Sequence, residues 1–326
     1  MGKIIKRILI IVGVVILVLI VGLFAMCAIA DKRNKNYWKY VESNKPIEKK
    51  YIALGDKEVS EYSRSDSKYG KMEIWYPSDM KDSSAKYPLV IMANGTGIKA
   101  SAYTEVFKHL ASWGFVVAGN EDENSRSGAS SEATLNYVLQ LNAESGNIFY
   151  GKIDTDNIGI AGHSQGGVGA LNAVTEQPSG NKYKAIWTAS ATSRYHAIGL
   201  NNDSDDDKTW NCYPSKISIP CFMVAGTGNM DAGNMDKYTE SLEKGEAQGI
   251  CPKWWLDECY DAITANTKMV ARRKDKDHGD MLRWADGYMT AWFMYHLKGD
   301  TSADFFSGSN AEILSNKNWQ DVTKSI

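Results

Sequence analysis

The sequence lacks the features that mark several large classes of protein. It has no basic excess, because 37 Lys and Arg stand against 39 Asp and Glu, and nothing therefore points to nucleic acid. No period of about 20–50 residues repeats along the chain, which argues against a repeat solenoid. No C-x-x-C pair occurs among the five cysteines, which argues against a tetracysteine zinc site. With 43% hydrophobic and 23% charged residues, the composition is globular and excludes a disordered or collagenous chain.

The near-neutral total hides two segments of opposite charge. Residues 1–35 carry a net charge of +5, which leaves 31 basic and 38 acidic residues in the remainder. Residues 8–30 form an uncharged run of 23 residues, which as a helix would span a hydrocarbon core of about 30 Å. Lys3, Lys6 and Arg7 precede the run and favour a cytoplasmic N-terminus. We therefore expect a signal-anchor helix at 1–30, a linker at 31–46 and one domain at 47–326, outside the cytoplasm.

Two alternatives for this first segment also export the domain. The sequence Ala-Ile-Ala at 28–30 resembles a signal-peptidase site, so cleavage after Ala30 would give a secreted protein. A lipid anchor on Cys27 is a poorer match, because Met26 rather than a small residue precedes the cysteine.

Export would permit disulfides among the four cysteines of the domain. Short loops close at low entropic cost, which favours Cys251 with Cys259 and Cys212 with Cys221. Four unpaired small hydrophobic side chains are the alternative.

From residue 47 onward, short apolar runs alternate with segments of helical spacing. The expected strands are 71–76, 88–93, 114–118, 157–161, 184–188, 221–225 and 267–271, and the expected helices are 101–113, 130–142, 165–175 and 281–297. This alternation predicts an α/β fold, a mostly parallel doubly wound sheet with helices on both faces. Active sites in such sheets lie at the carboxyl ends of the strands.

The segment Gly-His-Ser-Gln-Gly at 162–166 matches G-x-S-x-G between an expected strand and an expected helix. That context is the strand–turn–helix of a nucleophile elbow, with Ser164 as the nucleophile. The flanking glycines are needed because a Cβ at either site would collide with the neighbouring strand or helix. An inert serine in a glycine-rich turn is the alternative.

A serine nucleophile needs a base and an acid that follow it along the chain. His278 lies in a polar loop after the last strand and is the preferred base, with His196 as the alternative. Asp231 follows the strand at 221–225 and is the preferred acid, with Asp236 as the alternative. The acidic run at 203–207 lacks the glycine and distal glutamate of an EF-hand, so we interpret it as a solvated loop rather than a calcium site.

An oxyanion hole requires backbone amides aimed at the developing negative charge. Gln165, directly after the nucleophile, would supply one amide, and Thr96, in the glycine loop after the strand at 88–93, the other. An ordinary glycine turn is the alternative for that loop.

These segments resemble the α/β-hydrolases of the dienelactone-hydrolase and cutinase-like polyester hydrolase (PET hydrolase-like) branch. The resemblance extends from about residue 88 to 278 and includes 153–167 (Ile-Asp-Thr-Asp-Asn-Ile-Gly-Ile-Ala-Gly-His-Ser-Gln-Gly-Gly) and 219–227 (Ile-Pro-Cys-Phe-Met-Val-Ala-Gly-Thr). It implies ester hydrolysis through an acyl-serine without cofactor or metal, by the triad Ser164, His278 and Asp231. The expected partner is a small or lipid-like ester, with the membrane contacted through residues 8–30.

The sequence departs from this family at two aromatic positions. Thr96 and Thr192 stand where polyester hydrolases of this branch usually carry aromatic residues, which argues against a polyester substrate. Trp254 and Trp255 would supply another apolar wall or pack inside a loop. An amidase, peptidase or acyltransferase on the same fold, and a non-catalytic surface-binding protein, are the alternative functions.

Overall fold

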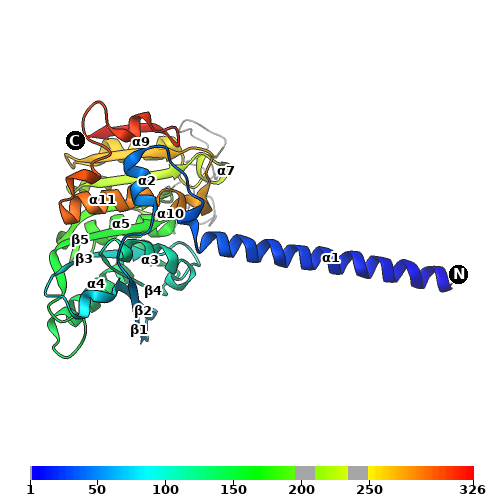
Figure 1. Cartoon of the computed structure of the whole chain (residues 1–326). Helices are drawn as coiled ribbons and strands as arrows, with labels where there is room; N and C mark the ends of the chain where they lie inside the picture. The colour runs from blue at the N-terminus through cyan, green and yellow to red at the C-terminus, as the bar shows by residue number, and fades with distance from the viewer. Residues whose placement is uncertain (1, 195–209, 234–248) are drawn as a thin grey trace.

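The computed structural model describes residues 2–194, 210–233 and 249–326, with side chains along the first helix given for Val12 and from Ile16 onward. A nine-stranded sheet runs through it in the order β1-β2-β4-β3-β5-β6-β7-β8-β9 (Figure 1). Neighbouring strands from β4 to β8 pair in parallel, whereas β1, β2 and β9 add antiparallel edges. This large mixed sheet with its helices fits the α/β-hydrolase class.

The described elements follow the expected alternation closely. The strands are β1 Val59–Asp66, β2 Gly70–Pro77, β3 Tyr87–Ala93, β4 Val116–Asn120, β5 Ile153–His163, β6 Tyr183–Ala189, β7 Cys221–Gly226, β8 Lys268–Arg273 and β9 Trp319–Ser325. The α-helices are α1 Gly2–Asn34, α2 Pro46–Ile52, α3 Thr104–Ser112, α4 Ala129–Ala143, α5 Gln165–Thr175, α7 Asn229–Ala232, α9 Lys253–Ala262, α10 Met281–Trp284 and α11 Asp286–Lys298. Three of the short 3-10 turns are η1 Tyr37–Lys39, η4 Ser125–Ser127 and η8 His278–Asp280, and η8 carries His278. The helix expected over 281–297 is divided at Ala285, and β1, β9, α2 and α9 had no counterpart among the expected elements.

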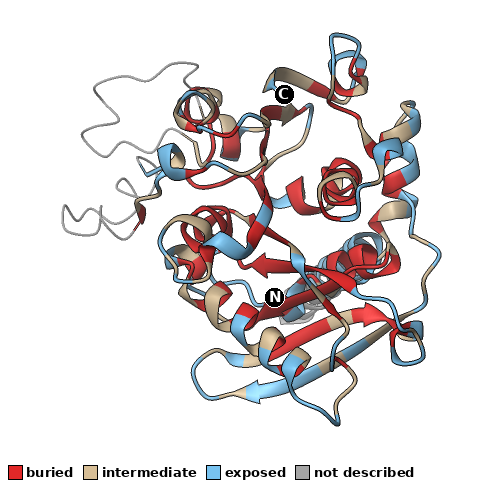
Figure 2. Cartoon of the chain, turned by 90° about the vertical axis from the view of Figure 1, so that its left-hand side faces the viewer, coloured by how far each residue is buried: buried red, intermediate tan, exposed pale blue. Residues whose placement is uncertain are grey.

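The sheet is buried on both faces, because successive side chains of a strand point to opposite sides. In β3, Val90 and Met92 join one apolar cluster while Leu89 and Ile91 join the other. Helices α2, α3 and α11 cover the first face, and α4, α5 and α9 cover the second. Buried residues therefore concentrate along the central strands and the helix surfaces that face them (Figure 2).

Helix α1 projects away from the sheet (Figure 1). Among the residues that the structure describes, no helix is long and apolar enough to cross a membrane. The membrane-spanning helix expected over residues 8–30 is therefore not supported.

The expected disulfides are wrong. All four cysteines of the domain are free thiols, and Cys221, Cys251 and Cys259 are fully buried in the apolar cluster beneath α4, α5 and α9. Burial raises the pKa of Cys221 to about 12, so its thiol is protonated at neutral pH. These cysteines contribute apolar volume to the core, as the alternative interpretation held.

Candidate active site

The nucleophile elbow has the strained geometry that its sequence predicts. Strand β5 ends at His163, helix α5 starts at Gln165, and Ser164 between them has φ 59° and ψ −125°, a conformation that side chains rarely adopt. A Cβ on Gly162 would lie 2.0 Å from the carbonyl oxygen of Gly166, and a Cβ on Gly166 would lie 2.1 Å from that of Ala93. Only glycine fits at these two positions, so the sequence pattern has a steric cause.

The preferred base and acid come together with this serine. Ser164 Oγ lies 2.9 Å from His278 Nε2, and His278 Nδ1 lies 2.8 Å from Asp231 Oδ1. Asp231 is fully buried, and its Oδ2 accepts hydrogen bonds of 2.6 Å from the Ser190 hydroxyl and the Gly226 amide. Each carboxylate oxygen is thereby fixed, which orients the imidazole with Nε2 toward the serine.

Asp277 is a site residue that the sequence reasoning missed. Its carboxylate accepts hydrogen bonds from the amides of His278, Asp231 and Met230, at 2.8, 3.0 and 3.1 Å. Burial alone would raise the pKa of Asp277, but these amides outweigh burial and lower it. One ionised side chain therefore connects the loop of His278 to the turn of Asp231. The available signal was an aspartate directly before the histidine, at a helix N-cap position.

The side chain of His163, inside the elbow, contacts the backbone of His278. Its Nε2 donates to the carbonyl oxygen of His278 at 2.8 Å, and the two rings lie 4.7 Å apart. Burial, and then the charge of His278, lower the pKa of His163 to about 4. His163 is thus neutral at physiological pH and helps to position the loop of His278.

The expected oxyanion turn lies against the nucleophile. A Cβ on Gly95 would be 3.5 Å from the Cβ of Ser164. Asn94 anchors the turn, because its side chain donates to the carbonyl oxygens of Asn120 and Asp122 at 2.6 and 2.8 Å. Thr96 follows on the exposed side of this turn. Gln165 is the first residue of α5, so its amide has no acceptor within the helix.

The two tryptophans expected to form a wall or pack inside a loop belong to helix α9 and lie in the core. Trp254 and Trp255 are 8% and 3% exposed, and Trp255 Nε1 donates to the carbonyl oxygen of Ala191 at 3.2 Å. Thr192 is also buried, and its amide lies 3.3 Å from the carbonyl oxygen of Ser164. The packing interpretation of the tryptophans therefore holds, without the disulfide loop that was expected to carry them.

The other candidates from the sequence cannot be compared with the triad, and two further histidines pack elsewhere in the fold. His196, Asp236 and the acidic run at 203–207 lie outside the described residues. His109 is buried, with its Nδ1 2.7 Å from Asp286 Oδ2. His296 packs against Trp292, with the ring centroids 4.1 Å apart. Among the described residues, no group of three or more possible metal ligands is found.

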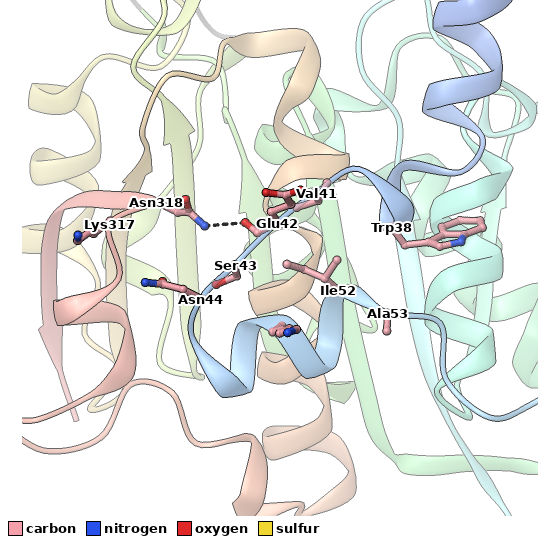
Figure 3. Close-up of a pocket in the computed structure, with 10 residues that line it drawn as sticks. Trp38, Val41, Glu42, Ser43, Asn44, Ile52, Ala53, Lys317 and Asn318 are labelled. Atoms are coloured by element: carbon pink, nitrogen blue, oxygen red, sulfur yellow. Dashed lines mark hydrogen bonds between the residues drawn. The ribbon is translucent and has the colours of Figure 1, made fainter.

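A cavity of about 700 Å³ contains none of the triad residues. It lies between the segment that follows α1, helix α2 and the loop before β9, with Trp38, Ile52 and Lys317 among its lining residues (Figure 3). The candidate site is the region around Ser164 and not this cavity.

Comparisons with known proteins agree with the fold and the elbow. Residues 46–198 match the family model of PET hydrolase-like proteins, a range that includes Ser164 and Thr96 but not Asp231 or His278. The resemblance to the PET hydrolase-like branch of the α/β-hydrolases is thus confirmed. A bis(hydroxyethyl) terephthalate hydrolase of Streptomyces coelicolor is 30% identical over 116 residues, which cover 34% of this chain and 35% of that protein. At a general level, these similarities support an esterase-type hydrolase.

Proposed function

We propose that the protein hydrolyses carboxylic esters through an acyl-serine intermediate, with Ser164 as nucleophile, His278 as general base and acid, and Asp231 as the orienting carboxylate. The observation that carries this proposal is the continuous chain of hydrogen bonds from Ser164 Oγ through His278 to Asp231, at 2.9 and 2.8 Å. The similarity to an ester hydrolase supports the same reaction class.

In the first half of the reaction, Ser164 Oγ attacks the ester carbonyl carbon while His278 Nε2 takes its proton. The negative charge that develops on the carbonyl oxygen is stabilised by the backbone amides of Gln165 and Thr96. The carbon–oxygen bond to the alcohol then breaks, and His278 returns the proton to the departing alcohol.

In the second half, His278 takes a proton from a water molecule, whose oxygen attacks the acyl carbon. The bond to Ser164 breaks, the carboxylic acid leaves, and the proton returns to Ser164. Asp231 stays ionised throughout and stabilises the imidazolium formed in both halves. No cofactor takes part in these steps.

Paired substrates test this proposal. We expect measurable hydrolysis of short p-nitrophenyl esters, little hydrolysis of the matching anilides, and a loss of about 10³-fold or more in kcat for Ser164→Ala or His278→Ala. Faster cleavage of the anilides would favour an amidase. Unchanged ester turnover in both variants would contradict the triad, and a folded wild-type protein without turnover on any acyl ester would favour a binding protein.

A further inference from the structure

A second cavity, of about 400 Å³, lies beside the helix that begins at the nucleophile. It opens between η4 and α5, with Arg126 and Asn172 among its lining residues. Asn172 is seven residues beyond Gln165, which corresponds to about 10 Å along the axis of α5. The cavity is also coupled to the oxyanion turn, because Ser125 in η4 donates through its hydroxyl to the carbonyl oxygen of Asn94 at 2.6 Å.

The walls of this cavity are held in place from within. Asn172 is 5% exposed, and its side-chain amide donates to the carbonyl oxygens of Arg126 and Asn211, at 2.8 and 2.9 Å. A single buried side chain therefore fixes the loop that carries Arg126 to the segment on the opposite wall. Such a preformed arrangement lowers the entropic cost of binding a ligand.

Among the described residues, the charged groups at the cavity are Arg126 and Glu176, and Lys216 forms an ion pair with Glu176. The guanidinium of Arg126 lies 5.2 Å from the ring of Trp210, and its Nη1 lies 3.4 Å from Asn124 Oδ1. Within the described parts of the chain, no carboxylate forms an ion pair with Arg126. The cavity's Glu176 is neutralised by Lys216 at 2.7 Å.

We propose that this cavity binds a carboxylate at the far end of the ester substrate, and that Arg126 selects it. A guanidinium that has no carboxylate partner among the described residues, and that lies beside side-chain amides, suits a ligand carboxylate through charge-assisted hydrogen bonds. The inference rests on ester hydrolysis at Ser164 and adds a substrate class to it, namely half-esters of dicarboxylic acids. The competing ligand is a hydroxyl group, because Oδ1 of Asn172 accepts no hydrogen bond from the described residues.

Three series of p-nitrophenyl esters of graded length test the proposal, ending in a carboxylate, a hydroxyl or a methyl group. For chains long enough to span about 10 Å, we expect the wild-type kcat/KM to be at least about tenfold higher for the carboxylate-ended ester than for the methyl-ended one. Added salt should reduce this ratio, because it screens the charge of Arg126. A ratio near one, or a preference for the hydroxyl-ended ester, would overturn the proposal.

Variants test whether the preference for carboxylate-ended esters depends on the side chain of Arg126. Arg126→Met should bring the ratio of carboxylate-ended to methyl-ended turnover close to one, and Arg126→Lys, which keeps the charge, should retain part of it. Arg64→Met, on the exposed edge strand β1, is the matched control and should keep the full ratio. A full ratio in Arg126→Met would contradict the role of Arg126.

Direct binding separates failure of this inference from failure of the proposed function. Calorimetry with a free straight-chain dicarboxylic acid should detect binding to the wild type and to Ser164→Ala, and weaker binding to Arg126→Met. If the wild type hydrolyses no ester but binds the diacid through Arg126, the ester-hydrolase proposal fails and the carboxylate site stands. If esters are hydrolysed at Ser164 and the diacid does not bind, the carboxylate site fails alone.

Discussion

At the scale of single residues, the candidate site depends on side chains that never reach the reacting atoms. Asp277 fastens the acid turn to the base loop through three backbone amides, and His163 holds the carbonyl of His278. Ser164, His278 and Asp231 could be named from the sequence because chain order and strand ends constrain them, and the structure places their side chains within hydrogen-bond distance. Sequence reasoning could not find the roles of Asp277 and His163, because these depend on backbone amides and carbonyls that are adjacent only in the folded chain.

Replacement of Asp277 tests its positioning role. Asp277→Ala should lower kcat about tenfold or more with little change in KM, because the base and the acid lose their common anchor. It should also lower the free energy of unfolding by about 1–3 kcal/mol, through the loss of charge-assisted hydrogen bonds. Asp275→Asn is the control, two residues away on the exposed surface, and should leave both quantities near wild type. An unchanged kcat in Asp277→Ala would contradict the positioning role of Asp277.

Two buried histidines should make the folded state less stable in acid. Burial is the largest cause that lowers the pKa of both His163 and His296 to about 4, whereas an unfolded imidazole titrates near 6.5. Between these pH values the unfolded chain binds more protons, so the free energy of unfolding should fall as pH drops from about 6.5 to about 4. Urea unfolding at a series of pH values measures this slope.

Replacing each of the two histidines should affect catalytic activity differently. His296→Phe and His163→Phe should each make the slope of stability against pH shallower. Only His163→Phe should also lower kcat, because His296 packs on Trp292 and Phe306 outside the site. Equal activity in the two variants would contradict the link from His163 to His278.

At the scale of elements, apolar strands were predictable and polar edges were not. The buried runs that became β3, β5, β6 and β7 carry their signal in composition, because both of their faces are covered. Edge strands β1 and β9 are rich in polar residues and acquire strand structure only by pairing with β2 and β8. The division between α10 and α11 at Ala285 was hidden by the helical spacing over 281–297, although Gly287 follows it by two residues.

A buried polar cluster attaches the segment after α1 to helix α11. Asp286 accepts from the Tyr37 hydroxyl and lies 2.7 Å from His109 Nδ1, while His109 Nε2 lies 2.9 Å from the carbonyl oxygens of Ile52 and Ala53. Burial would lower the pKa of His109, but the charge and hydrogen bond of Asp286 outweigh it and raise the pKa above its usual value. The pair therefore stabilises the fold fully below pH about 6.5, and this contribution is lost as pH rises through the raised pKa.

Breaking this cluster should weaken the fold without affecting the chemistry. Asp286→Asn should cost about 3–5 kcal/mol of unfolding free energy near pH 6, and less at higher pH, because it leaves a buried imidazolium without its partner. Tyr37→Phe should cost about 1–3 kcal/mol. Exposed Tyr40→Phe is the control and should stay within about 0.5 kcal/mol of wild type. A cost for Asp286→Asn that does not change with pH would contradict the charged pair.

At the scale of the whole molecule, the chain joins a basic N-terminal segment to an acidic domain whose mixed sheet fits the α/β-hydrolase class. Residues 1–35 carry a net charge of +5 against −7 for the remainder. The predicted disulfide pairs were wrong because loop length alone does not show that Cys221 and Cys259 face the core.

Export of the domain remains a prediction from the sequence. An alkaline phosphatase fusion after residue 326 should be active if the prediction is right, and a fluorescent protein at the same position should not be.

Active-site labelling followed by mass spectrometry tests the central claim most directly. The wild-type protein is treated with a fluorophosphonate, digested, and searched for the adduct on the peptide that contains Ser164. The triad predicts one adduct on Ser164, formed quickly at pH 8, formed far more slowly in His278→Ala and absent in Ser164→Ala. Equal labelling of Ser164→Ala, or an unlabelled wild-type protein that is folded, would contradict the account.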